Sequence, residues 1–232
     1  MKTKLYYCLL GVLCILSACK KDDNPKKQTQ TQLTDSLSYT INGKNYALTE
    51  PEGWEYGVAP ADVTYDPATG HSTKNADSTM FLSEYSFQSD RKNPNDTLFF
   101  VGVYFFRKYA LKDMVTASPV NYPVDQSALY APGSYVFAAD FIRNSTTNGV
   151  AINIGRIGQS YPTDYADQPT TITQAEEKNS SFVITSVTSI SGSNSFWIQA
   201  KFNAVVFDVN EKPIPVTNGY ARIKVDYRPA TN

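Results

Sequence analysis

The residues that could carry covalent chemistry are unevenly distributed in this 232-residue chain. The three cysteines, Cys8, Cys14 and Cys19, all fall within the first nineteen residues, and His71 is the only histidine. Beyond Cys19 the chain therefore has no thiol for a disulfide, a thiolate metal site or a cysteine nucleophile. One histidine cannot form a histidine-based metal cluster, and it allows a Ser-His-Asp triad only if His71 itself is the base.

The N-terminus has the pattern of a secretory signal peptide. Lys2 and Lys4 lie at the start of the chain, residues 5–16 form an apolar run, and the small residues Ser17 and Ala18 follow. A transmembrane helix needs about 20 apolar residues, so this run is too short to remain in a membrane. We expect residues 1–18 to be removed on secretion.

The tetrad Leu16-Ser17-Ala18-Cys19 resembles the lipobox of bacterial lipoproteins, in which the cysteine becomes the first mature residue and carries acyl chains. The resemblance implies that Cys19 is the lipidation site, because two or three acyl chains together anchor a protein stably to a bilayer. The alternative is an ordinary secreted protein that is cut near Ala18.

The charged run that follows, Lys20-Lys21-Asp22-Asp23, is similar to the signal that sends Bacteroidetes lipoproteins to the outer face of the outer membrane. This resemblance implies a lipid-anchored outer-membrane protein that faces the cell exterior. The alternative is a solvated charge cluster in a linker. Residues 19–36 contain hardly any apolar side chains, so we expect a disordered tether there and a single β-sandwich domain over residues 37–232.

Composition and turn signals favour an all-β fold. The chain has 16 Tyr and 12 Phe but only 3 Met, and aromatic residues suit strands. Short strand-like runs separated by turn signals predict an antiparallel β-sandwich or jelly-roll-like fold of about eight to ten strands. Three segments resemble uncharacterised Bacteroidetes lipoproteins with β-sandwich domains: residues 38–44, 129–135 and 217–220. That resemblance carries no known active site.

Individual segments give more specific expectations. Asn42-Gly43 and Asn148-Gly149 each predict a hairpin, because Asn-Gly accepts the positive φ angles of a type I′ turn. Residues 97–106 are apolar on both faces and predict a central strand, and residues 219–227 alternate as a strand with one face in water. Residues 135–142 predict another strand, residues 50–70 a long loop or two short strands, and residues 109–116 one or two helical turns.

Asp140 and Glu84 are the candidate acids if the chain is a carbohydrate-active hydrolase. A glycosidase needs two carboxyl groups roughly 5–9.5 Å apart. Each acid lies within a predicted strand, Asp140 in residues 135–142 and Glu84 in residues 79–87, where a solvent-facing structural role is the alternative. Nothing in the sequence places them near each other.

Aromatic residues outside the predicted strands are the better indication of function. Trp54, Tyr56, Tyr161 and Tyr165 could form a surface on which a sugar ring or a peptide stacks, and Trp197 either joins them or belongs to the core. The alternative is ordinary partial burial, which is common for Trp and Tyr.

We therefore expect a non-enzymatic binding or accessory module for a glycan or protein partner, with no cofactor and no metal. A carbohydrate-active hydrolase and a structural or adhesin-type subunit that works by strand addition are the alternatives. The formal net charge is −1, and loss of the signal peptide with its two lysines would leave −3. Without a basic stripe, this balance argues against nucleic acid as a partner.

Overall fold

The computed structural model describes nine stretches of the chain. These are residues 33–50, 54–58, 61–66, 71–88, 100–117, 120–140, 147–156, 159–163 and 171–226. All of them except Leu33 belong to one compact unit, Thr34–Asn232. Cys19 and Tyr165 lie outside the described residues.

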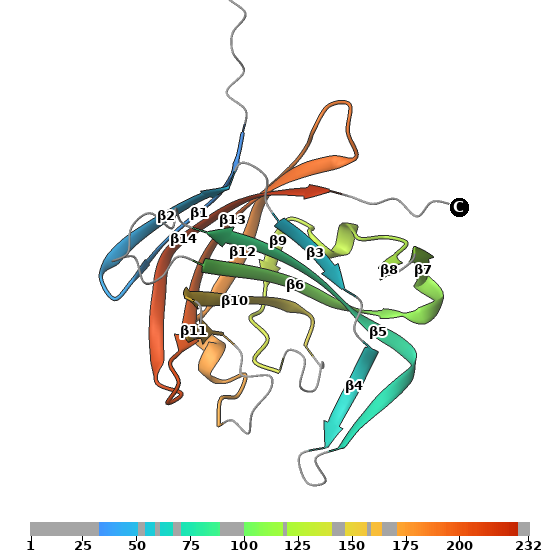
Figure 1. Ribbon diagram of the computed structural model, residues 1–232, viewed down its shortest axis with the longest axis horizontal. Helices are drawn as coiled ribbons and strands as arrows, with labels where there is room; N and C mark the ends of the chain where they lie inside the picture. The colour runs from blue at the N-terminus through green and yellow to red at the C-terminus, as the bar shows by residue number, and fades with distance from the viewer. Residues whose placement is uncertain are drawn as a thin grey trace, which may run out of the picture. The chain divides into compact units, whose positions relative to one another are not determined.

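Two six-stranded antiparallel sheets and a separate hairpin account for the fourteen strands of the described residues (Figure 1). Sheet A has the order β2 (Lys44–Glu50), β1 (Asp35–Ile41), β14 (Pro213–Asp226), β13 (Ser195–Phe207), β12 (Ser181–Ser189) and β9 (Gly133–Tyr135). Sheet B has the order β11 (Gln159–Pro162), β10 (Gly149–Arg156), β6 (Phe100–Ala110), β5 (His71–Gln88) and β3 (Trp54–Val58), and β4 (Ala61–Asp66) pairs with the first half of β5.

The remaining elements are short. The hairpin is formed by β7 (Met114–Ala117) and β8 (Val120–Pro123). Three 3-10 turns complete the described part of the chain: η1 (Leu111–Asp113), η2 (Ser127–Leu129) and η3 (Glu176–Asn179). The single 3-10 turn of η1 is the only helical structure within the segment where one or two helical turns were expected.

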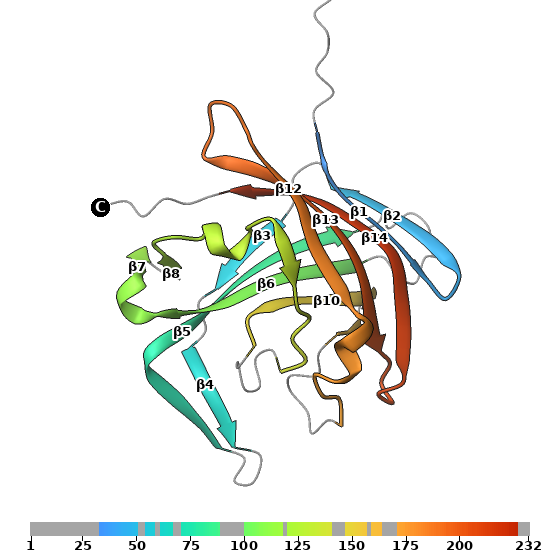
Figure 2. The ribbon, with the colours of Figure 1, turned by 180° about the vertical axis from the view of Figure 1, so that it is seen from behind.

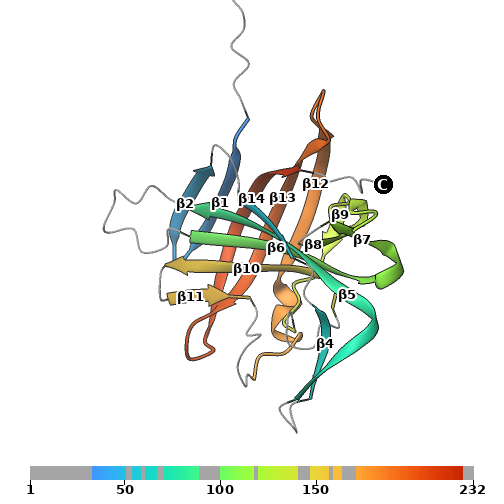
Figure 3. The same cartoon turned by 45° about the vertical axis from the view of Figure 1, so that its right-hand side comes forward.

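The two sheets face each other across one hydrophobic core, which confirms the all-β sandwich prediction. Leu37 and Ile223 of sheet A and Val103, Phe105 and Ile152 of sheet B belong to the same buried cluster. Figures 2 and 3 show the two layers, and in Figure 3 the strands of sheet B cross those of sheet A. The strand count exceeds eight to ten because strands as short as β9 and β11 have too few residues to give a sequence pattern.

Several local expectations are confirmed. Asn42 and Gly43 have φ of 51° and 73° and join β1 to β2 as a hairpin. The apolar run expected to form a central strand contributes to β6, which lies in the middle of sheet B. In β14, Ala221, Ile223 and Val225 are buried while Lys224 and Asp226 are exposed. For residues 50–70 the sequence left two alternatives, a long loop or two short strands, and the structure has the two strands β3 and β4.

The first strand begins earlier than expected, at Asp35, inside the last two residues assigned to the tether. Asp35 is buried and its carboxylate accepts a hydrogen bond from the Lys224 backbone nitrogen at 2.6 Å. The Arg222 side chain also donates to the Thr34 carbonyl at 2.9 Å. These long-range contacts with β14 order residues that are polar enough to be mistaken for linker.

Two expectations near the middle of the chain are wrong. The predicted strand at residues 135–142 ends its pairing with β12 at Tyr135, and Phe137 then makes a parallel bridge to Val150 in sheet B. Asn148-Gly149 is therefore not the turn of a hairpin. Gly149 is required for another reason: a Cβ there would lie 2.2 Å from the Val136 carbonyl oxygen. The chain changes sheets at this point, which is how corners form in crossed sandwiches.

Candidate functional site

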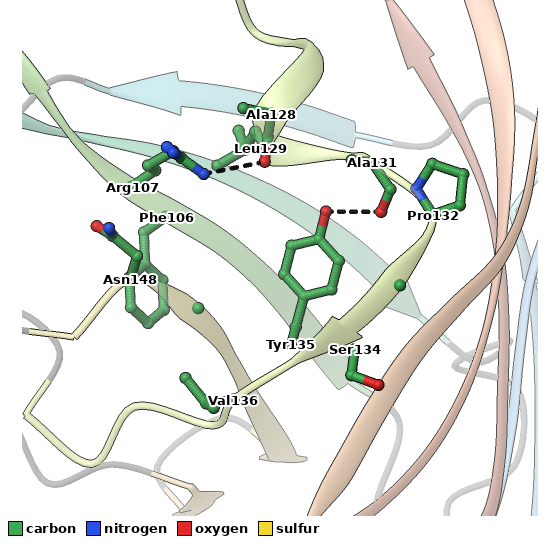
Figure 4. Close-up of a pocket in the computed structure, with 12 residues that line it drawn as sticks. Phe106, Arg107, Ala128, Leu129, Ala131, Pro132, Ser134, Tyr135, Val136 and Asn148 are labelled. Atoms are coloured by element: carbon green, nitrogen blue, oxygen red, sulfur yellow. Dashed lines mark hydrogen bonds between the residues drawn. The ribbon is translucent and has the colours of Figure 1, made fainter.

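A pocket of about 400 Å³ lies where β6, β9 and the segment of residues 128–132 meet (Figure 4). Its volume is within the range of small-molecule sites. Its lining combines apolar side chains with a few polar ones. The lining residues are Phe106, Arg107, Ala128, Leu129, Ala131, Pro132, Gly133, Ser134, Tyr135, Val136, Asn148 and Gly149.

The wall formed by residues 128–132 is held by the core. Leu129 and Tyr130 are each 2 % exposed. The Tyr130 ring packs against Phe105 at 5.4 Å between centroids, and its hydroxyl accepts a hydrogen bond from the Tyr85 hydroxyl at 3.0 Å. At the start of this segment, the Asp125 carboxylate accepts a hydrogen bond from the Ser127 backbone nitrogen at 2.7 Å. This wall is therefore preformed rather than dependent on a ligand.

Tyr135 brings its aromatic ring to the pocket from β9. Its hydroxyl donates to the Ala131 carbonyl at 2.8 Å, and its ring meets Phe105 and Phe182 edge to face, each at 6.3 Å between centroids. Burial raises the pKa of Tyr135, while the Arg107 guanidinium acts in the opposite direction. The hydroxyl therefore stays protonated at neutral pH and keeps the ring in place.

Arg107 supplies the positive charge of the pocket. It follows the buried residues Val101, Val103 and Phe105 on the inner-facing register of β6, and it is half-buried. Its guanidinium donates to the Ala128 carbonyl at 3.4 Å, which is a long and weak hydrogen bond (Figure 4). In the part of the chain that the structure describes, no carboxylate forms an ion pair with Arg107.

Two nearby groups respond to this charge. Burial raises the pKa of Tyr109 to about 12, and the Arg107 guanidinium opposes that effect. Hydrogen bonds from Ser127 lower the pKa of Asp125, and the charge of Arg107 adds to this effect. Arg107 is thus the one cation among the described residues that line the pocket, and Asp125 is near enough to interact with its charge.

Three of the four predicted aromatic residues lie in strands at the two edges of sheet B. Trp54 and Tyr56 lie in β3, opposite Ser86 and Glu84 of β5, and Tyr161 lies in β11, opposite Ile154. The expectation that these three lie outside strands is wrong, because β3 pairs with the distant β5 and β11 pairs with the preceding strand β10. β3 and β11 are at opposite edges of sheet B, four strand spacings or roughly 19 Å apart.

Trp197 belongs neither to the pocket nor to the buried core cluster. It lies in β13 opposite Lys224 of β14 and is half-buried. The Arg222 guanidinium lies 5.9 Å from its ring centroid. Trp197 is thus on the outward-facing register of sheet A, where it makes a cation–π contact.

The two candidate acids do not line the pocket. Glu84 lies in β5, half-buried, where the hydroxyls of Tyr104 and Ser86 donate to its Oε1 at 3.2 and 3.1 Å. Asp140 is in a turn that follows the Phe137 bridge, so its expected place inside a strand is wrong. No acidic residue is among the described residues that line the pocket.

Comparison of the chain with protein-family models, with curated proteins and with solved structures finds no match. Within the described stretches, no group of three or more His, Cys, Asp or Glu residues could hold a metal ion. The same stretches contain no helix that is long and apolar enough to cross a membrane.

Sequence reasoning missed Arg107, the residue on which the chemistry of the pocket depends. A signal was present, because the alternation of β6 places Arg107 on the same register as Val101, Val103 and Phe105. A cation at a core-facing position is costly unless a partner compensates it. The pocket itself could not be foreseen, since it depends on the long-range meeting of β6 with β9.

Proposed function

We propose that this chain is a lipid-anchored surface protein whose β-sandwich domain is a non-enzymatic binding module for a glycan. The observation that carries the proposal is the preformed pocket between β6, β9 and residues 128–132. It combines the Tyr135 ring and apolar walls with the polar groups of Arg107 and Asn148. Apolar walls with a few placed polar groups are typical of small-ligand sites.

Binding is better supported than hydrolysis. A glycosidase would need a pair of carboxyl groups beside the sugar, and the described lining residues include none. Glu84 accepts hydrogen bonds from the hydroxyls of Ser86 on β5 and Tyr104 on β6, and Asp140 lies in a separate turn. Trp54 and Tyr56 lie in β3 opposite Ser86 and Glu84 of β5, and their stacking role stays a prediction.

Strand addition is supported less well. The edge strands of sheet A are β2, with seven residues, and β9, with three. β2 begins with the exposed Lys44, and Asn45 accepts a hydrogen bond from the Thr40 hydroxyl across the hairpin. A polar edge that carries lysine is a common protection against unwanted pairing.

Filling the pocket should block glycan binding. Val136 lines the pocket and is exposed, and its side chain lies on the same side as Asn148 (Figure 4), so we expect Val136→Trp to fold and to weaken binding of any glycan selected on an array by at least about tenfold. Ser189→Trp, at an exposed strand position away from the pocket, is the matched control and should bind as the unmodified chain does. Titration calorimetry on the purified chains measures both. An array that selects no glycan, or equal binding by the two variants, would contradict the proposal.

The proposed lipid anchor at Cys19 can be tested separately from the pocket. Cys19→Ser removes the thiol that would be acylated, so we expect the variant to leave the membrane fraction and appear in the soluble fraction. Cys14→Ser, inside the apolar run, is the control and should remain with the membranes. Fractionation with metabolic labelling by a fatty acid measures the change. Continued labelling and membrane retention of Cys19→Ser would refute the lipidation site.

A further inference from the structure

We propose that the ligand of this pocket is an acidic sugar whose carboxylate is bound by Arg107. This inference rests on the proposed function of the same pocket, and it adds the chemical class of the ligand.

Most of the hydrogen-bonding capacity of Arg107 is available. A guanidinium has five N–H donors in a planar fork. In the described residues, one long bond to the Ala128 carbonyl at 3.4 Å is its sole hydrogen bond. The side chain is half-buried, and a partly desolvated cation is costly unless an anion compensates it. A carboxylate of the ligand would supply two oxygens for bidentate pairing.

The local charge favours an anion with a single negative charge. Arg107 is the one charged residue among the described residues that line the pocket. Asp125 lies close enough for the two charges to interact, so it already offsets part of the positive potential. A phosphate monoester carries about −1.5 to −2 charges at pH 7. A carboxylate with one charge matches this single, partly balanced guanidinium better.

The rest of the wall suits a sugar ring. The Tyr135 ring is fixed by its hydrogen bond to Ala131 and offers an apolar surface beside Pro132. The side-chain oxygen of Asn148 accepts a hydrogen bond from the Lys108 backbone nitrogen at 2.7 Å, which leaves the Asn148 amide NH₂ as a donor at the rim. Together with the Arg107 guanidinium, this gives polar groups beside an aromatic ring, the arrangement that a polyhydroxylated ring needs.

A peptide with a free C-terminal carboxylate fits less well. Such a ligand usually gains affinity from main-chain hydrogen bonds along a sheet edge. The edge strand beside the pocket, β9, has only three residues, Gly133–Tyr135. It can offer few of these bonds, so the affinity must come from the pocket itself.

The test compares matched acidic and neutral sugars on the purified full-length chain by titration calorimetry. The probes are methyl glucuronide and methyl galacturonide, each against the corresponding neutral methyl glycoside. We expect at least one acid to bind about tenfold or more tightly than its neutral counterpart. R107Q should abolish this difference, and R107K should retain part of it because it keeps the charge but loses the planar fork. K112Q removes an exposed charge of η1 outside the pocket and should keep the difference.

The outcomes separate the two proposals. Equal binding of acidic and neutral sugars would overturn the acidic-sugar inference and leave the binding pocket intact, whereas no binding of any sugar or array glycan would overturn both. Tighter binding of a peptide carboxylate, or of inorganic phosphate or sulfate, would overturn the inference in favour of that ligand. If the melting temperature shows that R107Q does not fold, the inference is tested by R107K and by the comparison of acidic with neutral sugars on the unmodified chain.

Discussion

Replacing Phe182 with alanine is expected to lower the free energy of unfolding by about 3–5 kcal/mol, the usual cost of removing a buried aromatic ring. Phe182 is fully buried in β12, and its ring contacts aromatic rings from both sheets. It stacks on Phe202 of sheet A at 6.0 Å between centroids and meets Phe105 of sheet B edge to face at 5.6 Å. The cavity left by alanine would therefore lie between the two layers.

Urea denaturation of the purified chain measures this loss. Val187→Thr on the same strand is the control, because Val187 is exposed and threonine keeps the β-branched shape; we expect a change within about 0.5 kcal/mol. Phe182 also contacts Tyr135 and Phe137, so the alanine variant should bind pocket ligands more weakly even where it remains folded. A loss no larger than that of the control would show that this ring does not join the sheets.

Features fixed by neighbouring residues were predictable from the sequence. Asn42-Gly43 forms its hairpin because both residues accept positive φ, which is a property of the dipeptide itself. The final strand, β14, alternates buried and exposed residues because one of its faces is on the core and the other is in water. These signals need no knowledge of the rest of the chain.

Features that depend on distant segments were not predictable. Tyr135 begins a run with strand-forming residues, but its pairing with Phe182 of β12 ends there and Phe137 bridges to Val150 instead. The sequence pattern around Gly149 is that of a turn, whereas the glycine is needed because the Val136 carbonyl passes so close. The same change of sheets creates the pocket, so neither the change of sheets nor the pocket could be predicted from the local sequence.

The strand that contains two of the candidate aromatic residues also depends on a distant segment. Trp54 and Tyr56 are surrounded by prolines and glycines, which indicates a loop, yet β3 forms because the second half of β5 offers it a partner. Arg107 could have been found from its register in β6, but its significance depends on β9 and residues 128–132 beside it. A cation at an inward-facing strand position indicates a binding site only when the segments that pack beside it are also known.

The second large effect is a pH-dependent loss of stability caused by Glu177. This residue of η3 is 4 % exposed and packs beside β13. Burial raises the pKa of its carboxyl to about 7, the nearby Ser180 side chain opposes the shift, and the charge of Glu176 adds to it. The folded state therefore holds a proton on Glu177 at pH values where the unfolded chain has lost it.

The direction of the pH dependence of stability follows from the number of protons that the folded and unfolded states bind. Between the unfolded pKa of 4.5 and the folded pKa of about 7, the folded state binds more protons, so the free energy of unfolding falls as pH rises. The contribution of this group is most favourable below pH 4.5 and is lost above pH 7. At about 1.4 kcal/mol per pKa unit, the loss is on the order of 3 kcal/mol.

Glu177→Gln removes the titration while keeping nearly the same shape. We expect the variant to be more stable than the unmodified chain at pH 8, by up to about 3 kcal/mol, and the advantage to shrink toward pH 5. Urea denaturation at several pH values between 5 and 8 measures it. Glu176→Gln is the matched control: hydrogen bonds from Thr173 lower the pKa of Glu176, which is exposed, so its replacement should give no such gain at pH 8. Parallel stability curves for Glu177→Gln and the unmodified chain would mean that Glu177 is already ionised in the folded protein at neutral pH.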